Sequence, residues 1–222
     1  MSLITQKELY EEAVLKISTD HSHQSKWVIK LGIVIVWEEV WNTIHNILVT
    51  NKTKTGEQVH LNFYTQYSYN KWHHTNDMCP LCKNIPQNIY HIILDCPFVN
   101  TIWAHIQPIL FQFDKNSISD EEKAFGIVRI TNTPGLLTRN WLTYKMREEI
   151  MNFERMAYHS PHRASISLFK AKFNNSMASE IKRLMNKYND EYKLHLFDKL
   201  VAYRGILCEK LLEGEYRLKP IF

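Results

Sequence analysis

Hydrophobic residues recur at helical spacing along most of the first half of the chain. An i, i+3, i+4, i+7 stripe made by Trp37, Val40, Trp41, Ile44, Ile47 and Leu48 predicts a helix from about Trp37. The β-branched run at 33–36 is either the lead-in to that helix or a short strand. A stripe over 3–17 predicts an N-terminal helix, residues 18–26 are expected to form a polar loop, and Val59, Phe63, Tyr64 and Tyr67 predict a helix with an aromatic face.

The second half of the chain repeats the helical pattern over longer stretches. After Pro97, a residue that suits a first helical turn, one apolar face is formed by Phe98, Ile102, Trp103, Ile106 and Leu110. Ser119 ahead of three acidic residues predicts the N-cap of a brief helix. The segment 131–135 (TNTPG) is the best domain boundary, and two or three long amphipathic helices are expected over 136–159 and 164–212, with a break at 159–162.

These elements predict a mainly α fold, in which a helical domain with a Cys-Cys-His-Cys zinc knuckle is followed by long C-terminal helices. Three parts are expected: an N-terminal helix and loop at 1–24, a zinc-binding domain at 25–130 with its knuckle at 79–96, and a basic helical tail at 131–222. Only six glycines among 222 residues favour helices over a glycine-punctuated sheet or a phosphate-cradling fold.

Composition also bounds the class of protein. A hydrophobic share of 45% predicts an ordered globular chain with its own core. The charged N-terminal segment lacks the apolar stretch of a secretory signal, and the longest apolar run, 31–37, is shorter than the ~20 residues of a membrane span. We therefore expect a soluble, intracellular protein of the cytoplasm or nucleus, where cysteines serve as thiols or metal ligands and not as disulfides.

Charge is unevenly distributed, although the net charge is only +4. Residues 1–138 contain 11 Lys and Arg against 13 Asp and Glu, whereas residues 139–222 contain 16 against 10. The basic tail is either a surface that binds a polyanion or an ordinary solvated helix face, and charge alone leaves both interpretations open.

Three of the four cysteines lie within eighteen residues, in the stretch CPLCKNIPQNIYHIILDC at 79–96. The spacing Cys79-x2-Cys82-x8-His91-x4-Cys96 supplies four ligands for one tetrahedral zinc ion. Four protein ligands leave no open position for water or substrate, so the predicted zinc ion is structural and not catalytic. Three thiolates give the site a charge of about −1, which nearby N–H donors or Lys83 would have to offset.

These residue types allow other interpretations. The cluster could be buried cysteines and a core histidine, or a redox Cys-x-x-Cys, although the latter leaves His91 and Cys96 unexplained. His73 or His74 could replace His91 as the nitrogen ligand. Cys208 lies in a stretch expected to be helical and is interpreted as a small buried hydrophobe. His159 and His162 lack a carboxylate at a persuasive spacing, which favours a polar interhelical turn.

The stretch resembles the zinc-binding domain that follows the polymerase in non-LTR (LINE-type) retrotransposon reverse transcriptases. That family's pattern is roughly Cys-Pro-x-Cys, an acidic residue, His-x4-Cys-Pro and a Trp seven residues further, and this chain has CPLC, HIILDCP and Trp103 in that order. The flanks KELYEEAV, KWVIKLGIVIVWEEVWNTIHNIL and NWLTYKMREEIMNFERMAYHS resemble the family as well. Two positions depart from it, because Lys83 stands where a Gly is common and Gln87 where a Glu is common.

Catalytic motifs are missing from the sequence. The polymerase of that family, an RNA-directed DNA polymerase, needs paired aspartates for Mg²⁺, and this chain has no Asp-Asp. A phosphate-binding Gly-x-x-x-x-Gly-Lys loop, a serine nucleophile elbow and a restriction-like nuclease pattern are also missing. We therefore expect a non-catalytic protein.

The resemblance implies nucleic-acid binding, with RNA or DNA as partner, either a single strand or a target duplex, beside the polymerase part of a retroelement. Candidate contacts to phosphate or base are Lys71, Trp72, His73, Lys83, Arg139, Lys145, Arg147, Arg155, Arg163, Lys170 and Lys172. An alternative of a different class is a zinc-stabilised assembly module that binds protein and no nucleic acid. A nuclease with a site built from dispersed residues is a third hypothesis.

Overall fold

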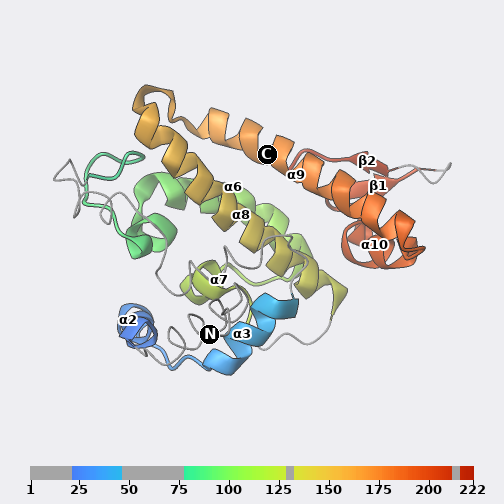
Figure 1. Ribbon diagram of the computed structural model, residues 1–222, viewed down its shortest axis with the longest axis horizontal. Coiled ribbons are helices and arrows are strands. Elements are labelled where there is room, and N and C mark those ends of the chain that lie inside the picture. The colour runs from blue at the N-terminus through green and yellow to red at the C-terminus, as the bar shows by residue number, and fades with distance from the viewer. Residues whose placement is uncertain (1–21, 47–77, 129–132, 212–215) are drawn as a thin grey trace, which may run out of the picture.

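The computed structural model describes residues 22–46, 78–128, 133–211 and 216–222 (Figure 1). The α-helices are α2 (Ser22–Leu31), α3 (Trp37–Asn46), α6 (Pro97–Phe113), α7 (Asp120–Phe125), α8 (Pro134–His159), α9 (Ile166–Asp190) and α10 (Leu194–Leu200). Three short helical turns are η1 (His91–Asp95), η2 (Pro161–Arg163) and η3 (Tyr203–Gly205), and strands β1 (Cys208–Lys210) and β2 (Tyr216–Leu218) form an antiparallel pair. The fold is mainly helical, as predicted.

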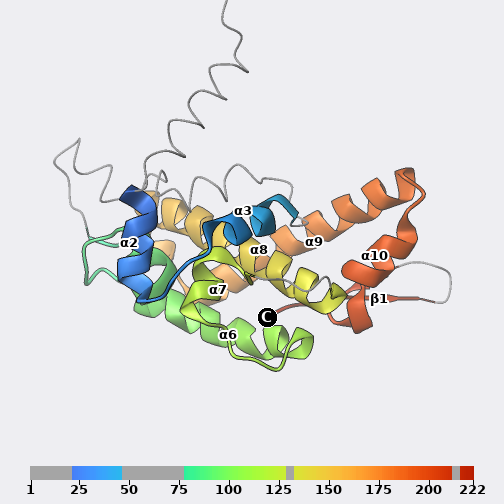
Figure 2. The same ribbon diagram turned by 90° about the horizontal axis from the view of Figure 1, so that it is seen from below.

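Helix α8 is the central element of the described structure. It contacts α6, α7 and η1 as well as α9 and α10, and the two views show it passing between these groups (Figures 1 and 2). Every residue from Thr138 to Arg147 is buried, so this part of α8 is enclosed on all sides. An amphipathic helix with a solvent face was expected here, but neighbours on all sides leave polar side chains inside the molecule.

Helix starts follow the capping signals of the sequence. Ser119 Oγ accepts a hydrogen bond from the Glu122 N–H at 3.0 Å and begins α7, as predicted. Ser165 Oγ accepts one from the Leu168 N–H at 3.2 Å and begins α9. Pro134 begins α8 inside the predicted boundary segment, where its missing N–H leaves no helical hydrogen bond unmade.

Gly126 ends α7 in a conformation that requires glycine. Its φ is +78°, and a Cβ there would lie 2.2 Å from Asn140 Oδ1 and 2.7 Å from Tyr144 Cε2. The close approach allows Asn140 Oδ1 to accept a hydrogen bond from the Ile127 N–H at 2.8 Å. The connection after α7 is thereby fastened to the central helix.

Several predicted elements differ from the structure. Residues 22–26 were expected in a loop, but Ser22–Leu31 is helical. Residues 34–36 are an irregular lead-in to α3, which begins at Trp37 as predicted. Long helices were expected throughout 164–212, but α9 ends at Asp190 and the short helix α10 is followed by η3 and the β1–β2 pair. Cys208 therefore lies in a strand and not in a helix, but it is buried as expected.

Other predictions lie outside the described residues. These are the N-terminal helix over 3–17, the aromatic helix near 59–67, and the candidate residues Lys71, Trp72, His73 and His74. In the part of the chain that the structure describes, no helix has the length and apolar character that a membrane crossing requires.

Candidate metal centre

Cys79, Cys82, His91 and Cys96 come together at one point of the fold. Their ligand atoms all lie within 4.8 Å of one another. Cys79 Sγ is 3.9 Å from Cys96 Sγ, and Cys82 Sγ is 3.3 Å from His91 Nε2. The edges of a tetrahedral site with two such ligand types measure about 3.5 to 3.8 Å, so the set fits one metal ion.

A tight turn positions the first two cysteines. The Lys83 N–H donates to the Cys79 carbonyl at 2.8 Å, the Cys79 N–H donates to the Ile85 carbonyl at 2.9 Å, and Met78 pairs with Pro86 in an antiparallel bridge. Lys83 has a φ of +60°, a left-handed conformation that glycine adopts without strain. A lysine at this position therefore adopts a backbone conformation that favours glycine.

A π-helical turn positions the other two ligands. In η1 the Cys96 N–H donates to the His91 carbonyl at 2.7 Å, so residues five apart in sequence lie one turn apart in space. Asn88 Oδ1 accepts from the His91 N–H at 2.9 Å, and Trp103 Nε1 donates to the Ile93 carbonyl at 3.2 Å. The spacing His-x4-Cys and the tryptophan seven residues beyond Cys96 are thus parts of one local structure.

Backbone N–H groups offset the negative charge of the thiolates. The backbone N–H groups of Leu81 and Cys82 act to lower the pKa of Cys79, and those of Phe98 and Val99 act to lower the pKa of Cys96. Cys96 is the N-cap of the 17-residue helix α6, whose first N–H groups favour an anion. The predicted N–H donors are present, and they come from a turn and a helix start.

The pKa values of three ligands are shifted by the contact between the two sulfurs and by burial. The hydrogen bond between the two sulfurs raises the pKa of Cys79 and lowers that of Cys96. Burial lowers the pKa of His91 and so favours the neutral imidazole that a metal requires. His91 Nδ1 is buried and has no hydrogen-bond partner within the described part of the chain.

Three of the four candidate ligands are buried. Cys79 and Cys96 are 0% exposed and His91 is 2% exposed, while Cys82 is partly exposed. Lys30 Nζ pairs with Asp95 Oδ2 at 2.6 Å and fastens α2 to the π-helical turn. Four protein ligands in a buried site suit a structural ion, and they leave no coordination position for a substrate.

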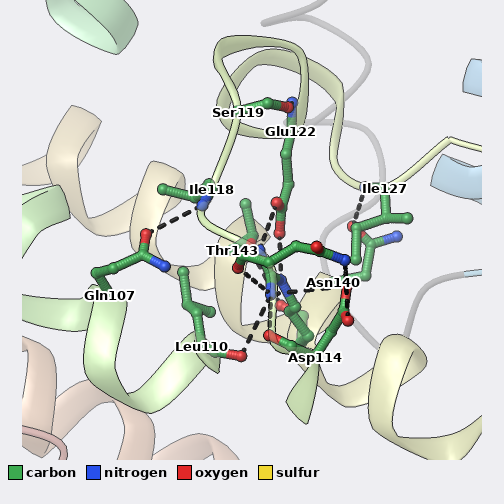
Figure 3. A network of polar contacts seen from close by, with 11 residues as sticks. Gln107, Leu110, Asp114, Ile118, Ser119, Glu122, Ile127, Asn140 and Thr143 are labelled. Atoms are coloured by element: carbon green, nitrogen blue, oxygen red, sulfur yellow. Dashed lines mark hydrogen bonds and ion pairs between the residues drawn. The ribbon is translucent and has the colours of Figure 1, made fainter. Parts of the chain in front are cut away.

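The predicted nucleic-acid contacts separate into buried and exposed residues. Arg139 is 1% exposed, and its Nε and Nη2 atoms each donate to the Glu122 carboxylate at 2.7 Å. Its Nη1 donates to the carbonyls of Asp114 and Asn116, where α6 ends (Figure 3). The prediction of a phosphate contact at Arg139 is therefore wrong, because every face of this guanidinium is occupied inside the protein.

Two further candidates on α8 are buried as well. Arg147 is 1% exposed, lies 4.3 Å from the centroid of the Tyr144 ring, and donates to the Ala124 carbonyl. Lys145 is 6% exposed, and its Nζ lies 2.6 Å from Glu148 Oε2. The prediction of a phosphate contact is therefore wrong for both residues. They are internal groups, because the central part of α8 does not face solvent.

The remaining described candidates lie on the surface. Lys83, Arg155, Arg163 and Lys172 are exposed, and Lys170 is half-buried with its ammonium 5.6 Å from the Phe222 ring centroid. Sequence reasoning missed Asn88 as a partner of His91, although an Asn three residues before the bonded N–H is a common cap pattern. Gln87, noted in the sequence only as a departure from the family pattern, is a buried side chain that acts to lower the pKa of Glu154 on α8.

Comparison of the chain with protein-family models, curated proteins and solved structures gives no match. The likeness to the reverse transcriptase zinc-binding domain accordingly rests on the motif residues of the sequence. The metal centre itself rests on the convergence of its four ligands.

Proposed function

We propose that this protein is a non-catalytic, nucleic-acid-binding module in which one structural zinc ion folds the segment 79–96. The observation that carries the proposal is the closed Cys3His set, whose four ligand atoms lie within 4.8 Å of one another. Three thiolates and one imidazole are a ligand set typical of zinc. When bound, the ion would supply cross-links between the turn and the π-helical turn, and no chemistry on a substrate.

Nucleic-acid binding is proposed from the resemblance together with the surface charge that remains after the correction above. Lys83, Arg155, Arg163 and Lys172 are exposed, and each can approach a phosphate without unfolding the chain. In the resembled family such a module would hold element RNA or target DNA, and an origin from a retroelement polyprotein belongs to the same proposal.

The metal part is tested by elemental mass spectrometry on protein purified without chelator. We expect one zinc per chain, lost in Cys82→Ser and retained in Cys208→Ser. Cys208 is the matched control because it is a buried free thiol outside the ligand set. Zinc-free wild-type protein, or equal zinc in both variants, would refute the structural site.

The nucleic-acid part is tested by fluorescence polarisation with a labelled single-stranded RNA, the matching DNA strand and a duplex at several salt concentrations. Binding should weaken with a log–log slope of about −0.7 for each single-strand phosphate contact. No binding at ~100 μM protein, which is as weak as ordinary non-specific association, would refute this part.

An assembly module is the second candidate function, favoured by two exposed apolar side chains. Ile29 is 81% exposed and Val34 is 90% exposed. A defined oligomer in light scattering, dissociated by Val34→Asp and unable to bind the labelled RNA, would favour this candidate over nucleic-acid binding.

A further inference from the structure

Helix α9 presents a line of polar and basic side chains to solvent. Its buried face includes the apolar residues Phe169, Phe173, Met177, Ile181 and Leu184. Opposite that face, five exposed side chains follow one another at steps of three and four residues. They are named the α9 stripe: Lys172, Asn175, Ser179, Lys182 and Asn186. Figure 1 shows α9 at the edge of the described structure, with α8 on its inner side.

The α9 stripe lies in a basic part of the chain. No Asp or Glu occurs between Glu154 and Glu180, and α9 as a whole contains five Lys and Arg against two Asp and Glu, a balance of +3. Within the described part of the chain, neither Lys172 nor Lys182 forms an ion pair. Both ammonium groups are therefore available to an anion from outside the protein.

The carboxylates closest to the α9 stripe have other positions or partners. Glu180 is only 8% exposed and belongs to the buried face, where its Oε1 accepts a hydrogen bond from Arg183 Nη2 at 3.0 Å. Glu149 of α8 accepts a hydrogen bond from Ser176. Asp190 lies one turn beyond the last residue of the stripe, at the end of α9. None of the three interrupts the line of donors.

The residue types of the α9 stripe suit a phosphate backbone. Ammonium, amide and hydroxyl groups all offer N–H or O–H donors, and lysine, asparagine and serine are among the side chains that contact phosphate oxygens. Fourteen positions separate Lys172 from Asn186. They correspond to about 21 Å of helix, which is roughly the length of six phosphate steps along one strand of a duplex.

The α9 stripe contains no aromatic side chain. Phe169 and Phe173 lie on the buried face, and Tyr188 packs against the core. Proteins that bind single strands stack the unpaired bases on aromatic side chains, whereas a duplex keeps its bases stacked and presents its phosphates outward. A line of donors without rings therefore fits a duplex better than a single strand.

We infer that the α9 stripe binds the phosphate backbone of a nucleic-acid duplex, with Lys172 and Lys182 each on one phosphate. The inference rests on the nucleic-acid binding proposed above. Asn175, Ser179 and Asn186 donate to phosphate oxygens between and beyond the two ammonium groups. Contacts of this kind fix the position of the helix on the duplex and do not depend on base sequence.

The inference is tested by fluorescence polarisation with a labelled DNA duplex at several salt concentrations. Wild type is compared with Lys172→Ala/Lys182→Ala and with the control Lys187→Ala/Lys199→Ala. The control removes the same charge from two exposed lysines outside the stripe, one of them on α9 itself. Alanine favours helix, so circular dichroism should show unchanged helicity in both variants.

The stripe variant should lose two phosphate contacts. The log–log salt slope should become smaller by about 1.8, and binding at 0.1 M salt should weaken by roughly 10- to 100-fold. The control variant should keep the wild-type slope and weaken by less than about 3-fold, because salt screens charges more than ~10 Å from the bound phosphates. The unlabelled duplex should compete better than its single strand, and better than inorganic polyphosphate at equal phosphate concentration.

The outcomes separate this inference from the function on which it rests. If wild type binds nucleic acid and the stripe variant behaves like the control variant, the inference fails while nucleic-acid binding stands. Tighter binding of the single strand than of the duplex, or equal competition by polyphosphate, also overturns the inference. If wild type binds no nucleic acid at all, the proposed function fails, and the inference fails with it.

Discussion

Arg139 and Arg147 lie eight residues apart on α8, and both are buried. They differ in their partners, because only Arg139 contacts a carboxylate. Arg139 forms a two-point contact with the Glu122 carboxylate and also binds carbonyls at the end of α6. Arg147 binds the Lys123 and Ala124 carbonyls at the end of α7, and its Nε and Nη2 atoms have no hydrogen-bond partner within the described residues. Both arginines therefore bind carbonyls at or just after a helix C-terminus, but only Arg139 is paired with an opposite charge there.

This difference predicts unequal effects of the same substitution. Arg139→Met leaves Glu122 as an unpaired buried charge and should lower the free energy of unfolding by about 3–5 kcal/mol. Arg147→Met removes a buried charge and leaves no partner charge behind, so it should cost at most about 1 kcal/mol. Urea denaturation followed by circular dichroism measures both values. A larger loss in Arg147→Met than in Arg139→Met would contradict the assignment of Glu122 as the decisive partner.

Glu154 is a buried carboxyl of the central helix, and its titration should appear in the stability of the protein. Burial raises its pKa from 4.5 to about 7, although Gln87 and the charge of Arg155 act in the opposite direction. Its folded pKa lies above the unfolded value, so the unfolded chain ionises first as pH rises. Stability should therefore fall between about pH 4.5 and pH 7 and then level off, with a total loss of about 3 kcal/mol.

Glu154→Gln removes that titration and retains a group able to bond with Gln87. The variant should be more stable than wild type at pH 8 and should lose the fall in stability between pH 4.5 and 7. Urea midpoints measured at pH 5, 6, 7 and 8 test this, with Glu149→Gln as control because Glu149 is only partly buried. Parallel pH profiles for wild type and Glu154→Gln would show that Glu154 stays ionised in the folded chain.

At the residue scale, the four candidate metal ligands could be predicted because ligand spacing is local in sequence. Cys79, Cys82, His91 and Cys96 lie within eighteen positions, and a turn and one helical turn bring them together. The fate of the basic residues could not be predicted in the same way. Whether Arg139 faces solvent depends on Glu122 and on the end of α6, and neither packing partner is set by the residues next to Arg139.

Helix ends show where element prediction succeeds and fails. Starts at Ser119 and Pro97 were indicated by residues whose side chains fix a helix N-terminus. The end of α9 carries no glycine: Tyr192, with a φ of +53°, takes the left-handed position. The Lys193 N–H donates to the Tyr188 carbonyl and the Tyr192 N–H to the Asn189 carbonyl, which is the Schellman pattern. A stop built by a tyrosine leaves no sequence signal.

Tyr192→Gly should therefore stabilise the protein. The tyrosine is 94% exposed and loses little packing, while relief of the left-handed strain is worth about 1 kcal/mol. Thermal unfolding of Tyr192→Gly and Tyr192→Ala separates the two effects, because alanine removes the ring and keeps the Cβ. The midpoint should rise for glycine and stay near wild type for alanine. An equal rise in both variants would attribute the gain to the ring and not to the backbone.

The hydrophobic pattern of the sequence did not predict the short strands β1 and β2, for a related physical reason. Cys208–Lys210 and Tyr216–Leu218 are three residues each, and their pairing depends on contacts with α10. The Tyr216 ring lies 4.7 Å from that of Phe197, Tyr216 O–H donates to Asp198, and Lys210 pairs with Asp198 at 2.7 Å. Tertiary contacts of this kind set short strands, and hydrophobic periodicity does not record them.

At the scale of the whole molecule, the metal centre and the C-terminal helices are joined through α8. Phe98 stacks on Phe153, and η1, which carries the ligand His91, contacts α8 directly, so residues next to the ligands reach the central helix. Helices α9 and α10 contact α8 and each other. Neither helix contributes a ligand to the metal centre. This arrangement predicts that metal removal loosens one part of the fold more than the other.

Hydrogen exchange with mass spectrometry should show this difference on chelation. The free energy that zinc supplies to small modules reaches ~10 kcal/mol, but less is expected here because α8 provides a core of its own. Amides of 79–100 should lose protection, since their turn, π-helical turn and the start of α6 depend on the ligands. Amides of α9 should keep their protection, and added zinc should restore the wild-type pattern.

Two variants serve as controls for this prediction. Cys82→Ser should resemble the chelated protein even with zinc present, whereas Cys208→Ser should resemble wild type. Loss of protection in α9 together with 79–100 would mean instead that the ion holds the entire described fold, and that the contacts of α8 alone are too weak to keep the C-terminal helices folded.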